Sequence, residues 1–278
     1  MDDAEGGIAE AIGWAPCRKC DRMTMDLKHL QRNWDDLGRA DPLWAVLTWP
    51  GKRGKRWDPE EFFAVGAAEI EALLRHIESL PVETQRRKAL DFGCGVGRLT
   101  QPLAEHFQEV WGVDIAPSMI ELAGKYNRYG DRCKYRVNDS DDLRLFADDT
   151  FDFVHSHLTL QHMHPQLAKG YIGEFIRVLA PGGLLVFQMA GEPTVTRRGP
   201  VRTLRRLVRS LIPDGLIAAG RKLRYGHLID MYGIPRDEMV SFLEGNGAEL
   251  LDVREDTSAG GGWTSFKYYA VKKGGRPR

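Results

Sequence analysis

Glycines at alternate positions follow a short apolar segment, and this spacing predicts a ligand-binding turn. The segment ends near Asp91, and Gly93, Gly95 and Gly97 come directly after it. Glycine lets a backbone approach a ligand where a Cβ would collide, and the helix that starts next presents free N–H groups to an anionic group. Another apolar segment ends in Asp114, an acid that can accept both hydroxyl protons of a ribose. These residues predict a pocket for a nucleoside-bearing cofactor.

The spacing of the glycines separates two classes of cofactor. A dinucleotide-binding turn needs a small residue three positions after its second glycine, and Arg98 stands there. The stretch Lys88–Thr100 instead resembles motif I of the class I S-adenosylmethionine-dependent methyltransferases. The resemblance implies that Asp114 binds the ribose and that the glycine turn, with Asp91 beside it, holds the amino-acid end of S-adenosylmethionine. A turn that needs glycine only for its backbone geometry is the structural alternative.

Two further segments resemble the parts of this family that hold the adenine ring. In the turn after the third expected strand, the resemblance implies that Asp139 contacts the exocyclic amine and that the backbone N–H of Ser140 contacts a ring nitrogen. Met119 stands where the family places an apolar cover over the adenine. The alternatives are a solvated acidic turn around Asp139 and an ordinary core position for Met119.

Four histidines gather on the segment that the resemblance places between cofactor and acceptor. Histidine is suited to remove a hydroxyl proton near neutral pH. We assign the role of base to His162, because it follows the strand end by enough residues to turn towards the acceptor, and we assign His157 to the cofactor or the loop. The other two are His155 and His164. A zinc site and a purely structural loop are the alternatives, and the predicted site contains no metal.

From Lys88 onward, expected strands and helices alternate. This order predicts an α/β fold with a parallel sheet covered on both faces and ligands at the carboxyl ends of the strands. After a further helix, two strand-like runs predict a C-terminal hairpin. The resemblance implies a Rossmann-like, doubly wound sheet of seven strands whose last strand is antiparallel. Strands are expected near 88–92, 110–114, 133–138, 151–156, 183–189, 248–255 and 263–272, and helices near 98–107, 117–126, 166–179 and 237–245.

The chain divides into three predicted parts. Residues 1–82 form a helical lid segment, residues 83–272 the S-adenosylmethionine-binding domain, and residues 273–278 a tail. Asp58 followed by Pro59 predicts the start of a helix within the lid segment. Four tryptophans of that segment either stack on an acceptor or pack the segment on the core. They are Trp34, Trp44, Trp49 and Trp57.

A basic insertion is expected at residues 194–232, within the cofactor-binding domain. In residues 201–212 apolar side chains recur at helical spacing while arginines occupy the other side, which predicts an amphipathic basic helix. This helix is a cap that recognises an anionic acceptor, a contact with an anionic membrane surface, or a solvated face packed on the domain. We favour the cap, because insertions at this end of the sheet stand over the pocket.

The composition excludes several classes of protein. Lysine plus arginine and aspartate plus glutamate both number 39, so no global field attracts nucleic acid, and we expect no nucleic-acid partner. No apolar run approaches the roughly 18 residues of a spanning helix, and the first residues are acidic, so we expect a cytoplasmic protein. The cysteines are too few for a disulfide framework, and Cys17 and Cys20 are interpreted as incidental rather than as half of a zinc site.

The predicted function is methyl transfer from S-adenosylmethionine to a small molecule or a saccharide. Oxygen is the expected acceptor atom, because His162 offers a base. N- or C-methylation of a small metabolite is the alternative within this class. Outside it, a nicotinamide-dependent oxidoreductase is disfavoured by Arg98, and a cofactor-binding protein without catalysis stays open. An anionic acceptor would suit the basic insertion, and the sequence leaves the oligomeric state undetermined.

Overall fold

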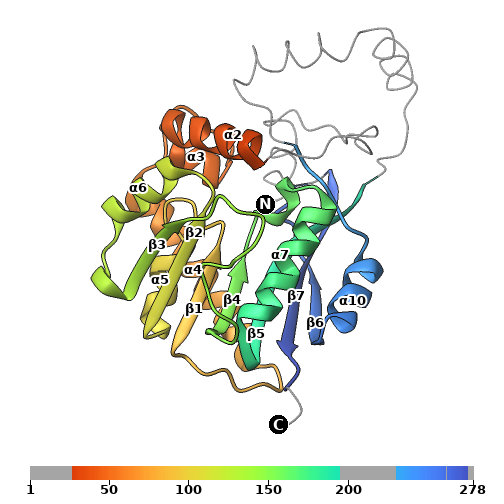
Figure 1. The fold of residues 1–278 in the computed structure, drawn as a ribbon. Coiled ribbons are helices and arrows are strands. Elements are labelled where there is room, and N and C mark those ends of the chain that lie inside the picture. Colours follow the sequence, from red (N-terminus) through yellow and green to blue (C-terminus); the bar gives the residue numbers. More distant parts are fainter. Residues whose placement is uncertain (1–26, 195–229, 261, 275–278) are drawn as a thin grey trace, which may run out of the picture.

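A seven-stranded sheet, in the order β3-β2-β1-β4-β5-β7-β6, organises the chain (Figure 1). The computed structural model describes residues 27–194, 230–260 and 262–274. Strands β1 to β5 pair in parallel, whereas β7 lies antiparallel between β5 and β6. The predicted α/β sheet with an antiparallel last strand is confirmed. The strands are β1 (Lys88–Phe92), β2 (Glu109–Asp114), β3 (Cys133–Val137), β4 (Phe151–Ser156), β5 (Leu179–Pro193), β6 (Ala248–Glu255) and β7 (Trp263–Lys272).

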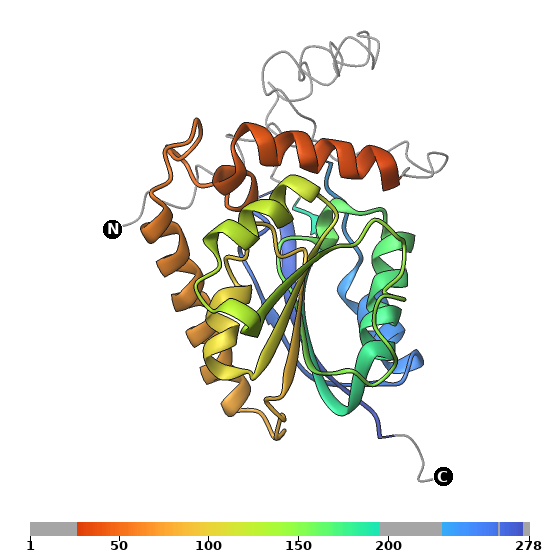
Figure 2. The same ribbon diagram turned by 60° about the vertical axis from the view of Figure 1, so that its left-hand side comes forward.

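Helices cover both faces of this sheet (Figure 2). Helices α4 (Pro59–Glu78) and α5 (Thr100–His106) lie on one face, and α7 (Pro165–Val178) and α10 (Arg236–Gly245) lie on the other. Successive side chains of a strand point to opposite faces, so Ala89 joins the core under α4 and α5 while its neighbour Leu90 joins the core under α7. Strand β4 is buried at every position, as expected for a central parallel strand.

Two short helices, α2 (Leu27–Ala40) and α3 (Pro42–Val46), lie over the carboxyl ends of the strands, where α2 crosses above the sheet (Figure 2). Helix α2 is attached to the segment after β2. Gln31 donates to the carbonyl of Ile115 at 3.1 Å, and the N–H of Ser118, in α6 (Pro117–Tyr126), donates to Asp35 at 2.8 Å. These contacts hold α2 above the edge at which ligands bind in folds of this kind.

The described part of the expected lid segment, from Leu27 on, contains three helices, but the last of them, α4, belongs to the sheet layers. Asp58 accepts the N–H of Glu61 at 2.9 Å and so caps α4 at the predicted position. Ile70 and Leu73 of α4 then pack with the sheet core. The domain boundary between residues 82 and 83 stays a prediction.

Strand β5 is longer than the expected 183–189. It begins at Leu179, which pairs with Phe151, and then the register shifts before Leu184 pairs with Phe153. Gly182 lies in this interval with φ of +76°, a conformation that glycine adopts without strain. Pro181, Gly182 and Gly183 therefore form an irregularity inside the strand.

Several predictions fall outside the described residues. They concern the basic helix 201–212, most of the insertion 194–232, the Cys17–Cys20 pair and the end of the tail. Among the helices that the structure describes, none is long and apolar enough to cross a membrane.

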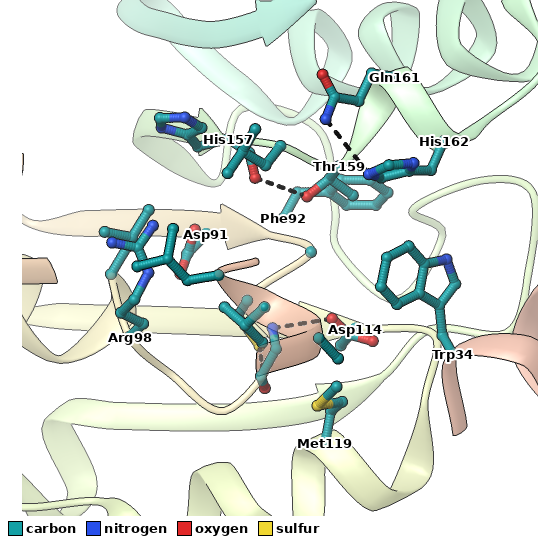
Figure 3. A pocket seen from close by; sticks show the side chains of 18 of the residues that line it. Trp34, Asp91, Phe92, Arg98, Asp114, Met119, His157, Thr159, Gln161 and His162 are labelled. Atoms are coloured by element: carbon teal, nitrogen blue, oxygen red, sulfur yellow. Dashed lines mark hydrogen bonds between the residues drawn. The ribbon is translucent and has the colours of Figure 1, made fainter. Parts of the chain in front are cut away.

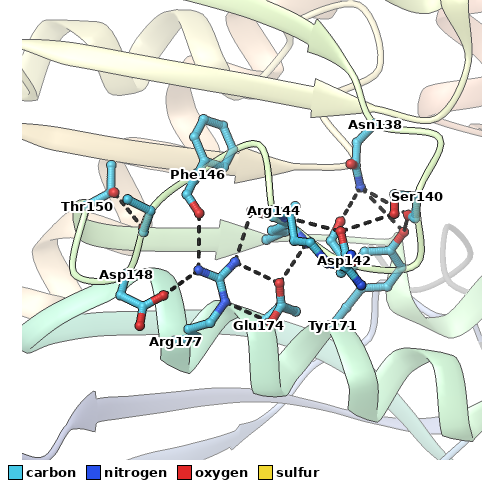
Figure 4. Close-up of polar contacts among 12 residues, drawn as sticks. Asn138, Ser140, Asp142, Arg144, Phe146, Asp148, Thr150, Tyr171, Glu174 and Arg177 are labelled. Atoms are coloured by element: carbon cyan, nitrogen blue, oxygen red, sulfur yellow. Dashed lines mark hydrogen bonds and ion pairs between the residues drawn. The ribbon is translucent and has the colours of Figure 1, made fainter.

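The loop between β3 and β4 is held on α7 by an arginine and a glutamate (Figure 4). Arg177 donates from Nη1 to the carbonyl of Phe146 at 3.1 Å and from Nη2 to that of Leu143 at 3.0 Å. Its guanidinium also bonds to both carboxylate oxygens of Glu174, at 2.8 and 2.7 Å. Glu174 in turn accepts the N–H of Leu143 at 2.7 Å. This cluster fixes the loop that begins at Asn138, a residue of the ligand cavity described below.

Replacing Arg177 by methionine is expected to lower the free energy of unfolding by about 2–4 kcal/mol, because several charge-assisted hydrogen bonds are lost together. Urea unfolding measures this change. Arg144 lies on the same loop with a side chain that is 87% exposed, and Arg144→Met is the matched control with an expected change below about 0.5 kcal/mol. Equal effects of the two substitutions would contradict the role given to Arg177.

Candidate cofactor and active site

A cavity of about 350 Å³ opens at the carboxyl ends of the parallel strands, beneath α2 (Figure 3). Most of the predicted site residues line it, whereas Gly97, Asp139 and Ser140 do not. Arg98 and His157 lie towards one end of the cavity, and Trp34 and His162 lie towards the other. The predicted residues in its wall are Asp91, Gly93, Gly95, Asp114, Met119, His157 and His162.

The glycine turn forms one wall of the cavity with a backbone that tolerates no side chain. Gly93 has φ of +75° and Gly95 has φ of +52°, both in the left-handed region that other residues rarely adopt. A Cβ on Gly93 would lie 2.1 Å from Oγ1 of Thr159, and a Cβ on Gly95 would lie 2.5 Å from Cγ2 of Val46. A side chain at either position would therefore collide with Thr159 or Val46 and force the turn to move.

Gly97 has a different role from its two neighbours. Its φ is +83°, but a Cβ there would lie 2.6 Å from the hydroxyl oxygen of Tyr135, a residue of β3. The glycine is needed so that the turn packs against β3. Its predicted contact with the cofactor stays a prediction, and its position outside the cavity wall gives that contact no support.

Asp114 presents its carboxylate to the cavity at the end of β2. Oδ2 accepts the N–H of Gly95 at 2.9 Å, and Oδ1 accepts the N–H of Ala116 at 2.9 Å. Burial raises the pKa of Asp114 to about 6, and the nearby Asp91 adds to that rise. Each carboxylate oxygen retains a further lone pair, so the group can accept the two hydroxyls of a ribose as predicted. Met119 lies in the cavity wall close to Asp114 (Figure 3).

The turn after β3, which is predicted to contact adenine, presents Asn138 to the cavity. Asn138 is buried and lines the cavity, while Asp139 is exposed and the Ser140 hydroxyl donates to Asp142 at 3.1 Å. The side-chain amide of Asn138 is anchored by donation to the carbonyl of Asp142, also at 3.1 Å. Contacts of Asp139 and Ser140 with adenine stay predictions, and Asn138 is the residue of this turn that the sequence interpretation missed.

Charged residues lie at the end of the cavity where Figure 3 shows Arg98 and His157. Asp91 is 2% exposed and accepts the Thr100 hydroxyl at 2.6 Å. Arg98, whose side chain is 3% exposed, pairs with Glu69 of α4 at 2.8 Å, and Glu69 also contacts His157. Burial alone would raise the pKa of Glu69, but His157 and Arg98 outweigh it and hold that pKa well below its usual range.

A buried donor at this end fits an anionic ligand group. Nε of Arg98 is buried and has no hydrogen-bond partner among the described residues. Buried donors are normally satisfied, so one without a partner beside a cavity indicates a bound group that supplies the acceptor. The carboxylate of the amino-acid end of S-adenosylmethionine has that chemistry, and Asp91 and Glu69 suit its ammonium. The residues present therefore fit the predicted cofactor.

His162 lies in the cavity wall and is almost fully buried. Its Nδ1 is 2.9 Å from the carbonyl oxygen of Asp230. Because a carbonyl can only accept, Nδ1 carries the proton and Nε2 is an acceptor. Burial lowers the pKa of His162 to about 4, although the Asp230 carbonyl opposes this, so the ring is neutral at pH 7. The indole of Trp34 meets the ring edge-on, with centroids 5.2 Å apart.

The remaining two histidines of the segment serve the structure. His155 is 1% exposed within β4, with Nδ1 3.6 Å from Asp91. The ring of His164 accepts the N–H of Gln166 at 3.4 Å and caps α7. In the part of the chain that the structure describes, no group of three His, Cys, Asp or Glu residues is placed to hold a metal ion.

The four tryptophans divide between the two proposed roles. Trp34 and Trp49 line the cavity, and Trp49 is 40% exposed. Trp44 and Trp57 are buried in the cluster formed by α2, α3, α4 and α6. Trp44 and Trp57 therefore pack the segment on the core, whereas stacking of Trp34 or Trp49 on an acceptor stays a prediction.

The fold and the cavity together define a class I S-adenosylmethionine-dependent methyltransferase domain. Residues 89–183 match the family described as a methyltransferase domain. Among solved structures, magnesium protoporphyrin IX methyltransferase from Synechocystis with bound S-adenosylhomocysteine aligns over 89% of this chain and 100% of its own, with a TM-score of 0.57 and 19% identity. A methyltransferase from Leishmania major aligns over 88% of this chain and 82% of its own, with a TM-score of 0.59 and 15% identity. These likenesses show the fold.

Curated relatives have a higher sequence identity to this chain than these solved structures, over shorter aligned segments. The bifunctional biotin biosynthesis protein of Cellvibrio japonicus is 32% identical over 191 residues, which cover 68% of this chain and 34% of that protein. The ubiquinone biosynthesis O-methyltransferase of Cereibacter sphaeroides is 35% identical over 109 residues, covering 39% of this chain and 43% of that protein. The alignments thus span less than half the length of either relative. The family match supports the predicted class of enzyme, and the residues of the cavity wall fit its predicted cofactor, S-adenosylmethionine.

The affinity for S-adenosylhomocysteine is expected to fall as the pH drops below about 6, the pKa of Asp114. Protonation removes an acceptor from the ribose hydroxyls, so each pH unit below that pKa weakens binding by up to roughly tenfold. Calorimetric titration between about pH 5 and about pH 8 measures the dependence. Asp114→Asn should bind weakly at every pH, and an inflection near pH 6 that persisted in this variant would assign the dependence to another group.

Proposed function

We propose that this chain transfers the methyl group of S-adenosylmethionine to an oxygen atom of a small molecule. The observation that carries the proposal is the neutral ring of His162, with Nε2 as an acceptor, in the wall of the cavity that also contains Asp91 and Asp114. When bound, the cofactor supplies a methyl carbon whose bond to a positive sulfur breaks as the acceptor oxygen attacks. His162 takes the hydroxyl proton through Nε2 and later returns it to water.

The low pKa of His162 decides when that proton moves. A ring with a pKa of about 4 is neutral throughout the physiological range, so no fraction of the enzyme is lost to the protonated form. The same ring removes a proton from a free hydroxyl only to a small extent, because hydroxyl groups are far weaker acids. Proton transfer is therefore expected to accompany formation of the oxygen–carbon bond rather than to precede it.

The described cavity wall favours an acceptor with a flat apolar group. Its charged residues are those assigned to the cofactor or their partners, namely Glu69, Asp91, Arg98 and Asp114. Apolar and aromatic side chains make up most of the rest of the wall and suit a ring that stacks or packs. They include Leu30, Trp34, Val46, Leu47, Trp49, Leu158 and Met163.

Two further properties of the acceptor are proposed. A saccharide is the second class of acceptor, and the exposed Trp49 offers a face on which a sugar can stack. An anionic acceptor depends on the basic insertion, outside the described residues. Salt-sensitive co-sedimentation with anionic vesicles would favour membrane contact by helix 201–212 instead.

Turnover on a matched panel of acceptors tests the proposed function. The purified chain is incubated with S-adenosylmethionine and, in turn, a phenol, the corresponding aromatic amine and a simple sugar. Release of S-adenosylhomocysteine gives the rate, and NMR of the product identifies the methylated atom. Methylation of the phenol oxygen supports the proposal. Methylation of the amine alone, or of a ring carbon, would replace it with N- or C-methyl transfer.

A further inference from the structure

A row of buried polar side chains connects the sheet to His162. Gln188 of β5 is 1% exposed, and its Nε2 lies 2.7 Å from Oγ of Ser265 and 3.0 Å from Oε1 of Gln161. Nε2 of Gln161 then lies 3.4 Å from Nε2 of His162, the contact drawn in Figure 3. None of these three residues was assigned to the site by the sequence. We call Ser265, Gln188 and Gln161 the amide chain.

The direction of every hydrogen bond in the amide chain follows from a main-chain donor at its origin. Oε1 of Gln188 accepts the N–H of Leu158 at 3.1 Å, and a backbone N–H cannot reverse its role. Both protons on Nε2 of Gln188 are therefore available for Ser265 and for Oε1 of Gln161. Since Oε1 of Gln161 accepts, the other end of that amide is a donor, and it faces His162.

The two sides of the His162 ring demand the same tautomer. The Gln161 amide donates towards Nε2, so that nitrogen holds a lone pair. On the far side, the carbonyl of Asp230 requires the proton on Nδ1. The Gln161 contact is longer than an ordinary N–H hydrogen bond of about 2.9–3.0 Å. It is weak enough for an acceptor hydroxyl to displace, while the orientation of the ring is kept.

The strained backbone of Leu158 is a second observation that supports a functional role for the amide chain. Its φ is +57°, in the left-handed region, which is costly for a residue that carries a side chain. Leu158 directly follows His157 and lines the cavity. The strained conformation places the N–H of Leu158 on Gln188, the bond that sets the direction of the whole amide chain.

We propose that Gln188, acting through Gln161, is a positioning residue that fixes His162 as the tautomer with its proton on Nδ1 and its Nε2 lone pair available to the acceptor. The effect on turnover rests on the proposed function of His162 as the base, but the effect on the tautomer does not. The substitution Gln188→Glu tests it. A carboxylate cannot donate to Oε1 of Gln161, so the Gln161 amide turns over, presents its oxygen to His162 and draws a proton onto Nε2.

The readouts are the nitrogen-15 chemical shifts of histidine-labelled full-length protein, the turnover number and the affinity for S-adenosylhomocysteine. The Asp230 carbonyl still accepts from Nδ1, so we expect a larger fraction of rings to be protonated at Nε2 as well as at Nδ1. Turnover should fall at least about tenfold, because a ring already protonated at Nε2 cannot take the proton of the acceptor. Affinity should change by less than about twofold, since neither glutamine contacts the residues that bind the ribose.

Gln101→Glu is the matched control. Gln101 is also a buried glutamine, 3% exposed, whose Oε1 accepts the N–H of Arg128 at 3.2 Å, and it lies on α5 outside the cavity wall. It reports the cost of a buried carboxylate alone and should leave the His162 tautomer and turnover unchanged. Should Gln188→Glu fail to fold, Gln161→Glu carries the same test, because its carboxylate also offers only acceptors to His162.

The outcomes separate the two proposals. Retention of the Nδ1-protonated tautomer in Gln188→Glu, or in Gln161→Glu where that variant replaces it, with unchanged turnover, would overturn the positioning role of Gln188. A changed tautomer with unchanged turnover would uphold the amide chain and reject His162 as the base. A changed tautomer with reduced turnover and intact cofactor affinity supports both.

Discussion

Replacement of His162 by alanine is expected to lower turnover by roughly 10²-fold or more while the affinity for S-adenosylhomocysteine is retained. The ring lies at the end of the cavity away from Arg98 and His157, so its loss removes the base without removing the groups assigned to the cofactor (Figure 3). Steady-state kinetics with a responsive acceptor and calorimetric titration of S-adenosylhomocysteine measure the two quantities.

His164→Ala is the control for this substitution. His164 belongs to the same segment but caps α7, so its loss should cost stability slightly and leave turnover unchanged. Unchanged turnover in His162→Ala would eliminate His162 as the base. A parallel loss of cofactor affinity would instead place the ring in the cofactor site.

Gly93→Ala is expected to weaken the binding of S-adenosylhomocysteine by at least about 100-fold, because even a displacement of about 1 Å at a ligand site has effects of this size. The new methyl group would lie 2.1 Å from Oγ1 of Thr159, and the backbone there has φ of +75°. The turn must therefore move, and it forms the wall of the cavity. Calorimetric titration of the purified variant gives the affinity.

Gly130→Ala separates this steric effect from backbone strain. Gly130 also has a positive φ, of +55°, but a Cβ there meets nothing within 4 Å. It should lower the free energy of unfolding by roughly 1–2 kcal/mol and leave cofactor affinity intact. Normal affinity in Gly93→Ala would show that the glycine turn is not the wall that the cofactor contacts.

The fold was largely predictable because its signals are local. Strands β1 and β4 and helix α6 have the predicted bounds, since apolar runs, Pro117 and the glycine turn mark their ends. The positions of Asp91 and Asp114 followed from a general rule, that ligands lie at the carboxyl ends of parallel strands. The same rule applied to β3 would have selected Asn138, the first residue after the strand, in place of Asp139 and Ser140.

Partners that meet only in the folded chain were not predictable. Glu69 lies 29 residues before Arg98 with the rest of α4 and strand β1 between them, and nothing in the surrounding sequence indicates that it pairs with Arg98 and contacts His157. Gly97 has a positive φ like Gly93, and only the tertiary position of Tyr135 shows that it faces β3. Gln188 did leave a signal, because a glutamine inside a buried apolar strand requires partners.

The place of β7 inside the sheet has a consequence for how the chain is made. Synthesis delivers Trp263–Lys272 after all the other strands, yet this strand supplies the hydrogen-bonding neighbour of both β5 and β6. Until it leaves the ribosome, β5 has an open edge that can pair with another nascent chain, and β6 has no neighbour at all. The sheet is therefore completed only after Lys272 has been synthesised, and interruption of synthesis before Trp263 yields a product prone to aggregate.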